Sequence, residues 1–327
     1  IQDAKLYLMI TCGLVIFSFM NQIFTGILTA MGNSRTSFIA TGIGLVLNIV
    51  LDPLFIFGFG FIPAMGVAGA AIATVLAQLV VMLLFVYTIM KEPVLFSDVH
   101  MLQAPDIMHT KEIFQIGLPS AVQSMLFSGI SMVIARLIAG WGDAAVAVQK
   151  VGSQIESISW MTAEGYAAAL NSFVAQNHGA KNTGRIWEGY RLSMIVMLSW
   201  GVFCSFVLIA FPQVIFQVFI QETEVLPLGI DYLRILGVSQ LFMCMEITTA
   251  GAFSGLGKTL PPSIVSITLT GARIPMAMLL GKWMGLNGIW WAITISSIGK
   301  GIVLLIWFLR DMKLTCSKRQ TEGTEVA

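Results

Sequence analysis

Long apolar stretches fill most of this 327-residue sequence, and few charged residues interrupt them. Hydrophobic residues make up 57% of the chain and charged residues only 11%, whereas soluble globular domains carry about 25% charged residues. A helix needs about 20 mostly apolar residues to cross a bilayer. The sequence therefore predicts an all-α polytopic membrane protein.

About nine stretches are long enough to span a bilayer, and segments rich in glycine, proline or charged residues separate them. The predicted spans are residues 6–30, 37–60, 66–90, 113–139, 145–175, 189–212, 229–256, 261–281 and 287–309. The longest polar segment, residues 91–112, contains Pro93 and Pro105. We interpret it as a linker between two helical bundles.

Lysine and arginine are distributed unequally between the two ends of these spans. One side receives only Lys5 and Lys282. The other side receives Arg35, Lys91, Lys111, Lys181, Arg185, Lys258, Arg310, Lys313, Lys318 and Arg319. Basic loops face the cytoplasm, so we expect a cytoplasmic C-terminus. With an odd number of spans Ile1 then lies outside, and we expect an N-terminal truncation with further spans upstream.

Two parts of the sequence resemble each other. An offset of 225 residues aligns Tyr7 with Tyr232, Leu8 with Leu233, Gly26 with Gly251 and Gly32 with Gly257. After a small difference in length, Gly66 aligns with Gly285 and Gly69 with Gly288. Three spans of one unit thus match the last three of a second unit. We predict that residues 1–90 are the last three helices of an N-terminal lobe and 91–112 a cytoplasmic linker. Residues 113–310 are then a complete six-helix C-terminal lobe, and 311–327 a cytoplasmic tail.

An aspartate lies inside the second predicted span. Asn48 and Asp52 are four residues apart, and therefore lie on one helical face. Pro53 removes the next amide donor, which favours a weakened helix at this point. An ionisable group inside a membrane is a functional-site hypothesis by default. Asp52 is therefore either a proton or cation site, or a helix-end carboxylate that touches interfacial water.

Charged residues also lie within spans of the second half, namely Glu156, Glu164, Glu246, Arg273 and Lys300. Similar depths on consecutive helices predict a salt bridge between Glu246 and Arg273, which Glu164 and Lys300 extend into a C-lobe polar network. Such pairs either fix the helices permanently or open during function, and both interpretations stay open. Three amides are candidates for cavity lining, although amides also hold helices together: Gln123, Gln149 and Gln154.

Several motifs resemble those of prokaryotic members of the multidrug and toxic compound extrusion (MATE) family. AMGNSRTSF, NIVLDPLFIFGFG and MGVAGAAIAT are similar to its fourth to sixth helices, and GLPSAVQS, FVAQNHGAKN, YLRILG and GAFSGLGKTLPPS to its second lobe. The resemblance implies a two-lobe bundle with six helices per lobe, of which about nine are present here. It implies an antiporter that exports small, often cationic or amphipathic organic molecules in exchange for H⁺ or Na⁺ by alternating access.

The resemblance also implies a coupling site. Some prokaryotic members build it from an Asn and an Asp of the fifth helix, a Thr of the sixth and an Asp of the first. The matching residues here are Asn48, Asp52 and Thr74, and the first-helix aspartate has no counterpart in the chain. The only metal expected is Na⁺ at Asp52. Other members place an acid midway along the seventh helix, where this sequence has Phe127.

The remaining expectations concern absences and partners. We expect no enzyme activity and no cofactor, because the sequence has no Walker loop, H-E-x-x-H motif or nucleophile elbow. A net charge of +1 argues against nucleic acid as a partner. We expect a monomer in the cytoplasmic (inner) membrane of the cell. The alternatives are a lipid-linked oligosaccharide flippase of related lobe architecture, a membrane-embedded enzyme and a non-transporting receptor.

Overall fold

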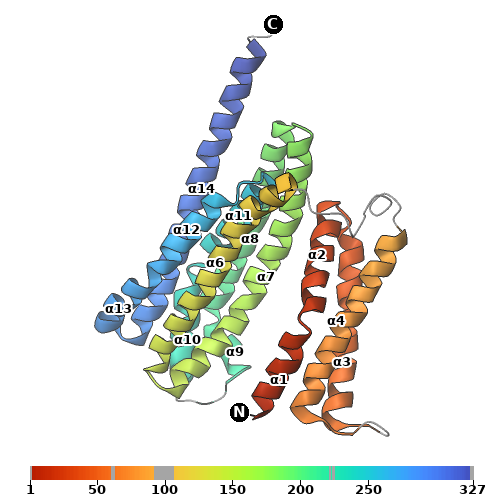
Figure 1. Ribbon diagram of the computed structural model, residues 1–327. Helices are drawn as coiled ribbons and strands as arrows, with labels where there is room; N and C mark the ends of the chain where they lie inside the picture. Colours follow the sequence, from red (N-terminus) through yellow and green to blue (C-terminus); the bar gives the residue numbers. More distant parts are fainter. Residues whose placement is uncertain (1, 60–62, 92–106, 221, 223–224, 325–327) are drawn as a thin grey trace. The chain divides into compact units, whose positions relative to one another are not determined.

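The computed structural model describes residues 2–59, 63–91, 107–220, 222 and 225–324. The regular elements in these ranges are α-helices, which confirms the predicted all-α fold. They form two compact units, residues 1–104 (unit 1) and 105–327 (unit 2); Figure 1 draws the helices of unit 1 in red to orange and those of unit 2 in yellow to blue.

Unit 1 contains α1 (Gln2–Gly13), α2 (Ile16–Ala30), α3 (Ser34–Phe57) and α4 (Gly66–Lys91). Helix α4 packs against each of the other three. Helices α1 and α2 are bent by 47° relative to each other and together cover the first predicted span. The buried core joins α2, α3 and α4 through Leu28, Ala40 and Phe85.

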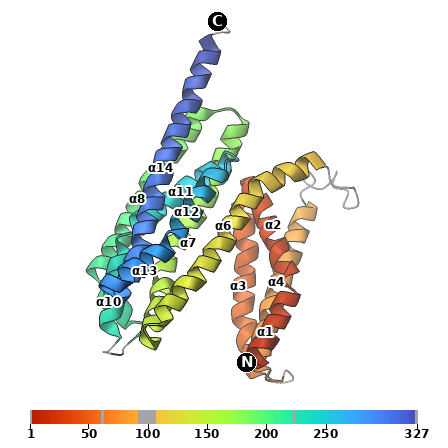
Figure 2. The same cartoon turned by 60° about the vertical axis from the view of Figure 1, so that its left-hand side comes forward.

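Unit 2 contains nine helices among its described residues. They are α6 (Ile107–Ala139), α7 (Asp143–Gly179), α8 (Thr183–Ala210), α9 (Pro212–Gln217), α10 (Leu226–Gly237), α11 (Gln240–Gly255), α12 (Leu260–Gly271), α13 (Arg273–Met284) and α14 (Leu286–Thr324). Helix α11 is central, because it packs against α7, α8 and α14; Figure 2 shows α12 and α13 beside α14. One buried core surrounds Tyr232 and Trp290, and another surrounds Tyr190 and Phe253.

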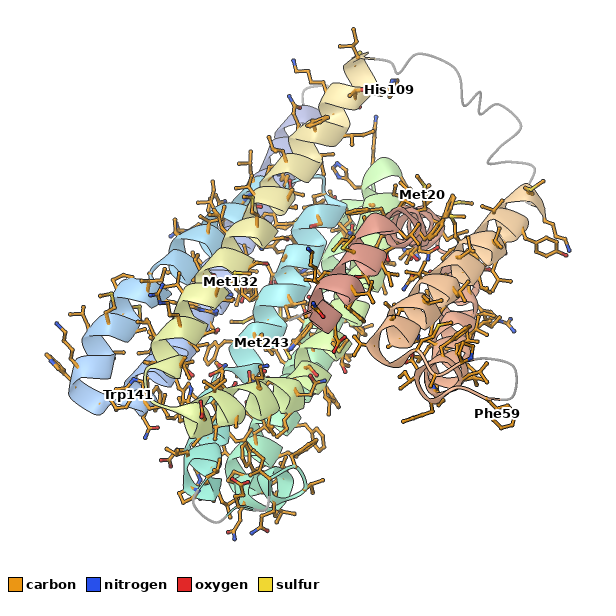
Figure 3. All side chains as sticks on the ribbon, turned by 60° about the horizontal axis from the view of Figure 1, so that its bottom comes forward. Met20, Phe59, His109, Met132, Trp141 and Met243 are labelled. Atoms are coloured by element: carbon orange, nitrogen blue, oxygen red, sulfur yellow. The ribbon has the colours of Figure 1, made fainter. Side chains whose placement is uncertain are left out.

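Six of the described helical segments are each long and apolar enough to cross a membrane, and the bent pairs α1–α2 and α10–α11 raise the total to eight. Helix α7, which corresponds to the predicted span at residues 145–175, is not among them although it has 37 residues. Its polar residues, including Glu156 and Glu164, lower its hydropathy. Figure 3 shows His109 and Trp141 at opposite ends of α6, with Met132 projecting between them.

Some helix ends differ from the prediction. Helix α6 begins at Ile107 rather than at residue 113, within the predicted linker. Helix α14 continues to Thr324 through the predicted tail and extends beyond its neighbours (Figure 1). Residues 92–106 of the linker lie outside the described residues, and the predicted lobe boundaries stay a prediction.

The sequence repeat corresponds to a repeat in the backbone. The α1–α2 bend of 47° has its counterpart in the 46° bend between α10 and α11. The turns that follow α2 and α11 share one hydrogen-bond pattern: Asn33 N donates to Leu28 O, and Lys258 N donates to Phe253 O, both at 2.9 Å. Each turn has its glycine, Gly32 or Gly257, at positive φ, as in a Schellman helix end.

A second shared feature brings two helix backbones into contact. A Cβ atom on Gly69 would overlap the Phe55 carbonyl oxygen, and a Cβ on Gly288 would overlap that of Leu280. Phe55 and Leu280 are again 225 residues apart. Glycine lets the helices approach this closely, so α3–α4 and α13–α14 pack in the same way.

Candidate functional site

Unit 1 contains a polar cavity of about 440 Å³, which we call the unit 1 cavity. Helices α2, α3 and α4 supply its walls. Its lining residues are Ser18, Asn21, Gln22, Thr25, Thr41, Gly44, Leu45, Asn48, Thr74, Ala77, Gln78 and Val81. Most of the side chains on the walls are neutral amides, hydroxyls or small groups. The cavity therefore offers hydrogen-bonding atoms inside otherwise apolar helices.

Asn48 and Thr74, both predicted site residues, lie on this cavity. The Asn48 amide nitrogen donates to Asp52 Oδ1 at 3.3 Å, so it connects the carboxylate to the cavity wall. Thr74 Oγ1 donates its proton to the Ala70 carbonyl at 2.9 Å, and its lone pairs are left to accept. Asp52 is half-buried, and α3 continues as a helix through Pro53.

An amide pair that we had not predicted forms the opposite wall. Asn21 Nδ2 on α2 donates to the backbone carbonyl and to the side-chain oxygen of Gln78 on α4, at 2.9 and 2.8 Å. Asn21 Oδ1 is buried and has no hydrogen-bond partner in the described structure. A buried acceptor without a donor is costly, so Asn21 is the side chain of this wall whose hydrogen bonding is incomplete.

In unit 2 an ion pair joins α11 to α14. Lys300 Nζ lies 2.9 Å from Glu246 Oε1, and their side chains are 7% and 15% exposed. The predicted partner of Glu246 was Arg273, and this prediction is wrong. Lys300 occupies the position next to Glu246 because α14, rather than α13, is the helix that packs along α11.

Arg273 begins α13 and is also buried. Its guanidinium donates to the hydroxyls of Ser296 and, at 3.0 Å, Ser297 on α14, and it lies 6.0 Å from the ring centre of Phe127. It forms no ion pair in the described part of the chain, although Glu246 and Glu156 act on it electrostatically. Glu164 does not extend this network, because it is exposed on α7 and pairs with no cation that the structure describes.

Glu156 lies deeper in unit 2, with Tyr232 and Gln240 as polar neighbours and Arg273 as the charged group that acts on it. Gln149 is bonded inside the same core, to Tyr232 and Trp290. Of the other amides that we predicted to line a cavity, Gln123 is half-buried and Gln154 is exposed. Their role stays a prediction.

The internal repeat relates the two polar regions position by position. The offset of 225 places Asn21 opposite Glu246 and Asn48 opposite Arg273. The offset of 219 that pairs Gly66 with Gly285 places Gln78 opposite Ser297 and Val81 opposite Lys300. Extending the alignment to polar positions would have identified Asn21 and Gln78 as site residues from the sequence. No group of three His, Cys, Asp or Glu side chains suited to hold a metal occurs in the described ranges.

Comparison with known families decides the identity of this fold. The sequence pattern of the MatE family matches residues 1–54 and 119–279, and these ranges include Asn48, Asp52, Glu156, Glu246 and Arg273. The chain belongs to the MATE family. Its members are transporters rather than enzymes, so this MATE chain is a multi-pass membrane transport protein.

Named relatives agree with this assignment. The chain is 33% identical over 316 residues to the probable multidrug resistance protein NorM of Thermotoga maritima, an alignment that covers 94% of this chain and 67% of the relative. It is 24% identical to the multidrug export protein MepA of Staphylococcus aureus, over 90% of this chain and 64% of the relative. The chain thus spans about two thirds of the length of these relatives.

Solved structures show the same fold. A crystal structure of MATE in the bent conformation superposes with a TM-score of 0.86 at 24% identity, over 96% of this chain and 70% of that one. A crystal structure of MATE in the straight conformation gives 0.85, also at 24% identity, over 94% and 69%. The MATE fold therefore accounts for nearly the whole chain.

Proposed function

We propose that this MATE chain is part of a secondary antiporter that exports small organic molecules in exchange for H⁺ or Na⁺. The unit 1 cavity carries this proposal. It places neutral oxygen and nitrogen groups inside apolar helices and connects them through Asn48 to Asp52, and ionisable groups at such depth mark ion pathways. The names of the relatives, multidrug resistance and multidrug export proteins, support drugs or metabolites as the exported molecules.

The repeat supports a cation as the cavity's ligand. At the position of Val81 in unit 1, unit 2 has Lys300, whose ammonium group pairs with Glu246. Unit 2 thus has a permanent cation, Lys300, at the position where unit 1 has an uncharged valine on the wall of its cavity. In unit 1 an exchangeable H⁺ or Na⁺ takes that role, with Asp52 as the anion and Asn21 Oδ1 and Thr74 Oγ1 as neutral oxygen partners.

The transport step follows from charge neutralisation. An ion that enters from outside neutralises Asp52: a proton turns the carboxylate into an acid that has an O–H donor of its own, whereas Na⁺ occupies lone pairs of the carboxylate, which stays an acceptor for Asn48. Helices α2, α3 and α4 repack around the cavity, which narrows the substrate path and releases the substrate outward. Return of the ion to the cytoplasm restores the first arrangement, so that the two conformations alternate.

Further assignments belong to the same proposal. Residues 1–90 contribute helices to one lobe and residues 113–310 form the other, with the linker and the C-terminus in the cytoplasm. The substrate is cationic or amphipathic, and the transporter acts as a monomer in the cell membrane. Arg273 and Lys300 are each bonded inside unit 2, so they do not form the basic surface that a lipid-linked sugar flippase needs for phosphate groups.

Transport by the complete gene product in proteoliposomes tests the proposal. Efflux of a fluorescent organic cation is measured under an imposed proton gradient and, separately, under a sodium gradient. We expect efflux under one of them, and loss of that efflux in Asp52→Asn. Asp143→Asn, which changes an exposed aspartate at the start of α7, is the matched control and should keep full activity.

Two outcomes contradict the proposal. Undiminished efflux in folded Asp52→Asn removes Asp52 from the coupling site. Absence of efflux under both gradients, with the protein folded, removes the antiporter and leaves the flippase, which the translocation of a labelled lipid-linked sugar would then show.

A further inference from the structure

Two buried acceptor oxygens in unit 2 lack a donor. Glu156 Oε1 on α7 and Gln240 Oε1 on α11 are both buried and have no hydrogen-bond partner in the described structure. The two side chains are neighbours, and Gln240 is completely buried. Because buried polar atoms are nearly always hydrogen-bonded, a carboxylate oxygen and an oxygen of a neighbouring amide that both lack a donor indicate that a proton is missing from this group of side chains.

A flip of the Gln240 amide, which would exchange the places of its oxygen and nitrogen, does not supply the missing donor. Its Nε2 donates to the Leu236 carbonyl at 3.3 Å. A flipped amide would place Oε1 against that carbonyl, and this would exchange one unsatisfied acceptor for a contact between two acceptors. The missing proton therefore has to come from Glu156 or from solvent.

A chain of donors leads to the other side of the same carboxyl group. Trp290 Nε1 donates to Gln149 Oε1 at 3.0 Å, and Gln149 Nε2 donates to the Tyr232 hydroxyl at 3.4 Å. That hydroxyl, having accepted, keeps its own proton for Glu156, its polar neighbour. The Tyr232 ring is held in place against Gly152, one turn before Glu156 on α7, where no Cβ would fit.

We propose that Glu156, Gln240 and Tyr232 form a second proton-binding site, located in unit 2 beside the bend between α10 and α11. The ionised carboxylate accepts from Tyr232. When the carboxylate takes up a proton, it becomes a neutral acid whose O–H donates to Gln240 Oε1. Both protonation states thus have hydrogen-bond partners, and a change of state reverses the direction of hydrogen bonding between Glu156 and Gln240, since both Tyr232 and Gln240 act on the ionised carboxylate. The transport role of this site rests on the antiporter proposed above, whereas its protonation does not.

The groups that face Glu156 set the charge of the site. Tyr232 on α10, Gln240 on α11 and Arg273 on α13 act on Glu156 itself. Glu246 on α11 and Lys300 on α14 belong to the same cluster through Arg273 and through their own ion pair. Arg273 acts on Glu156 directly, while Glu246 acts on Arg273 and Lys300. No charged group on α6 or α8 acts on Glu156 in the described structure. Two acids face two bases, so a proton taken up by Glu156 gives the cluster a net positive charge.

The position of Gln240 gives the proton a mechanical effect. Gln240 is the first residue of α11, directly after the break that separates it from α10. The two helices meet there at 46°. A change in the hydrogen bonding between Glu156 on α7 and Gln240 therefore acts directly beside this bend.

Infrared difference spectroscopy on the complete gene product, in lipid and between two pH values, tests the protonation directly. We expect a carbonyl stretch from a neutral carboxylic acid that is present in the wild type and in Asp52→Asn, and absent from Glu156→Gln. Glu164→Gln, which changes an exposed acid two turns along α7, is the matched control and should keep the band. Tryptophan fluorescence provides a second signal, since Trp290 ends the donor chain, and its pH response should be lost in Glu156→Gln and in Trp290→Phe.

The outcomes are decisive in both directions. A band that persists unchanged in folded Glu156→Gln overturns the proposal, as does a band that disappears equally in Glu164→Gln. Thermal unfolding of each variant identifies one that does not fold, and Glu156→Asp, which keeps the acid, should then restore the band. If the wild type shows this band but no gradient-driven efflux, the antiporter fails while the proton site stands.

Discussion

Helices α2, α3 and α4 of unit 1 and helices α11, α12–α13 and α14 of unit 2 have matching backbones but opposite polar chemistry. Unit 1 has Asn21, Asn48 and Val81 where unit 2 has Glu246, Arg273 and Lys300. The amides of unit 1 line a cavity of about 440 Å³, whereas the charged groups of unit 2 bond to one another and to serines.

The two units therefore show how one helix arrangement supports two roles, a fixed ion pair in unit 2 and, as we propose, an exchangeable ion in unit 1. In unit 2 the chain supplies its own cation: a buried ion pair joins α11 to α14, and the hydrogen bonds of Arg273 join α13 to α14. In unit 1 the equivalent position is Val81, which lines the unit 1 cavity together with Asn21, and Asn21 Oδ1 has no hydrogen-bond partner in the described structure. We infer that unit 2 is the more rigid of the two repeats and that unit 1 responds to an exchangeable ion.

Removal of the permanent cation should have the largest effect. Lys300→Met leaves Glu246 buried without its counter-charge, and breaking a buried ion pair costs about 3–5 kcal/mol. Thermal unfolding in detergent measures the loss. The double variant Glu246→Gln/Lys300→Met should recover much of it, and a double variant as unstable as the single one would argue against a mutual pair.

The close helix contact tests whether the backbones are equivalent. Gly69→Ala and Gly288→Ala each push a Cβ into a facing carbonyl oxygen, and overpacking of this kind costs about 1–3 kcal/mol. Both variants should lose similar stability in the same unfolding assay. Gly117→Ala should be close to neutral, because the added Cβ would have no atom within 4 Å other than those of its chain neighbours and its own helix backbone. A large loss at only one of the two glycines would break the structural match.

Transfer of the cation from unit 2 to unit 1 is the most direct test of the comparison. Val81→Lys places an ammonium group in the unit 1 cavity, where it competes with H⁺ or Na⁺. Gradient-driven efflux should fall at least about tenfold, equivalent to about 1.4 kcal/mol, while the protein stays folded. Val81→Met, similar in length but uncharged, should retain most of the efflux. Equal loss in both variants would point to filled space rather than to charge.

The smallest effect should come from the amide pair of unit 1. Asn21→Ala removes two hydrogen bonds to Gln78, but the adjoining cavity admits water that can replace them. We expect a loss of about 1 kcal/mol, measured by thermal unfolding. A loss as large as that of Lys300→Met would show that unit 1 is fixed as firmly as unit 2.

The sequence predicted the helical class, most spans and the repeat, because apolar length and glycine turns are local features. It did not predict the ion-pair partners. Glu246 and Arg273 have similar depths, but depth along a helix says nothing about rotation around its axis, and the packing of α11 against α14 decides which side chains meet. The sequence did predict a span over residues 145–175, although α7 fails a hydropathy criterion because it contains Glu156 and Glu164.

The length of α14 has a consequence for observing the transporter at work. Its 39 residues extend about 58 Å at 1.5 Å per residue, whereas the hydrocarbon core of a bilayer is about 30 Å thick. The N-terminal half of this helix bonds to α11 through Lys300 and to α13 through Ser296 and Ser297. A tilt of the whole helix by 10° about its N-terminal end therefore moves its C-terminal end by about 10 Å. A fluorophore at the C-terminus would report, strongly amplified, small rearrangements at the Glu246–Lys300 pair.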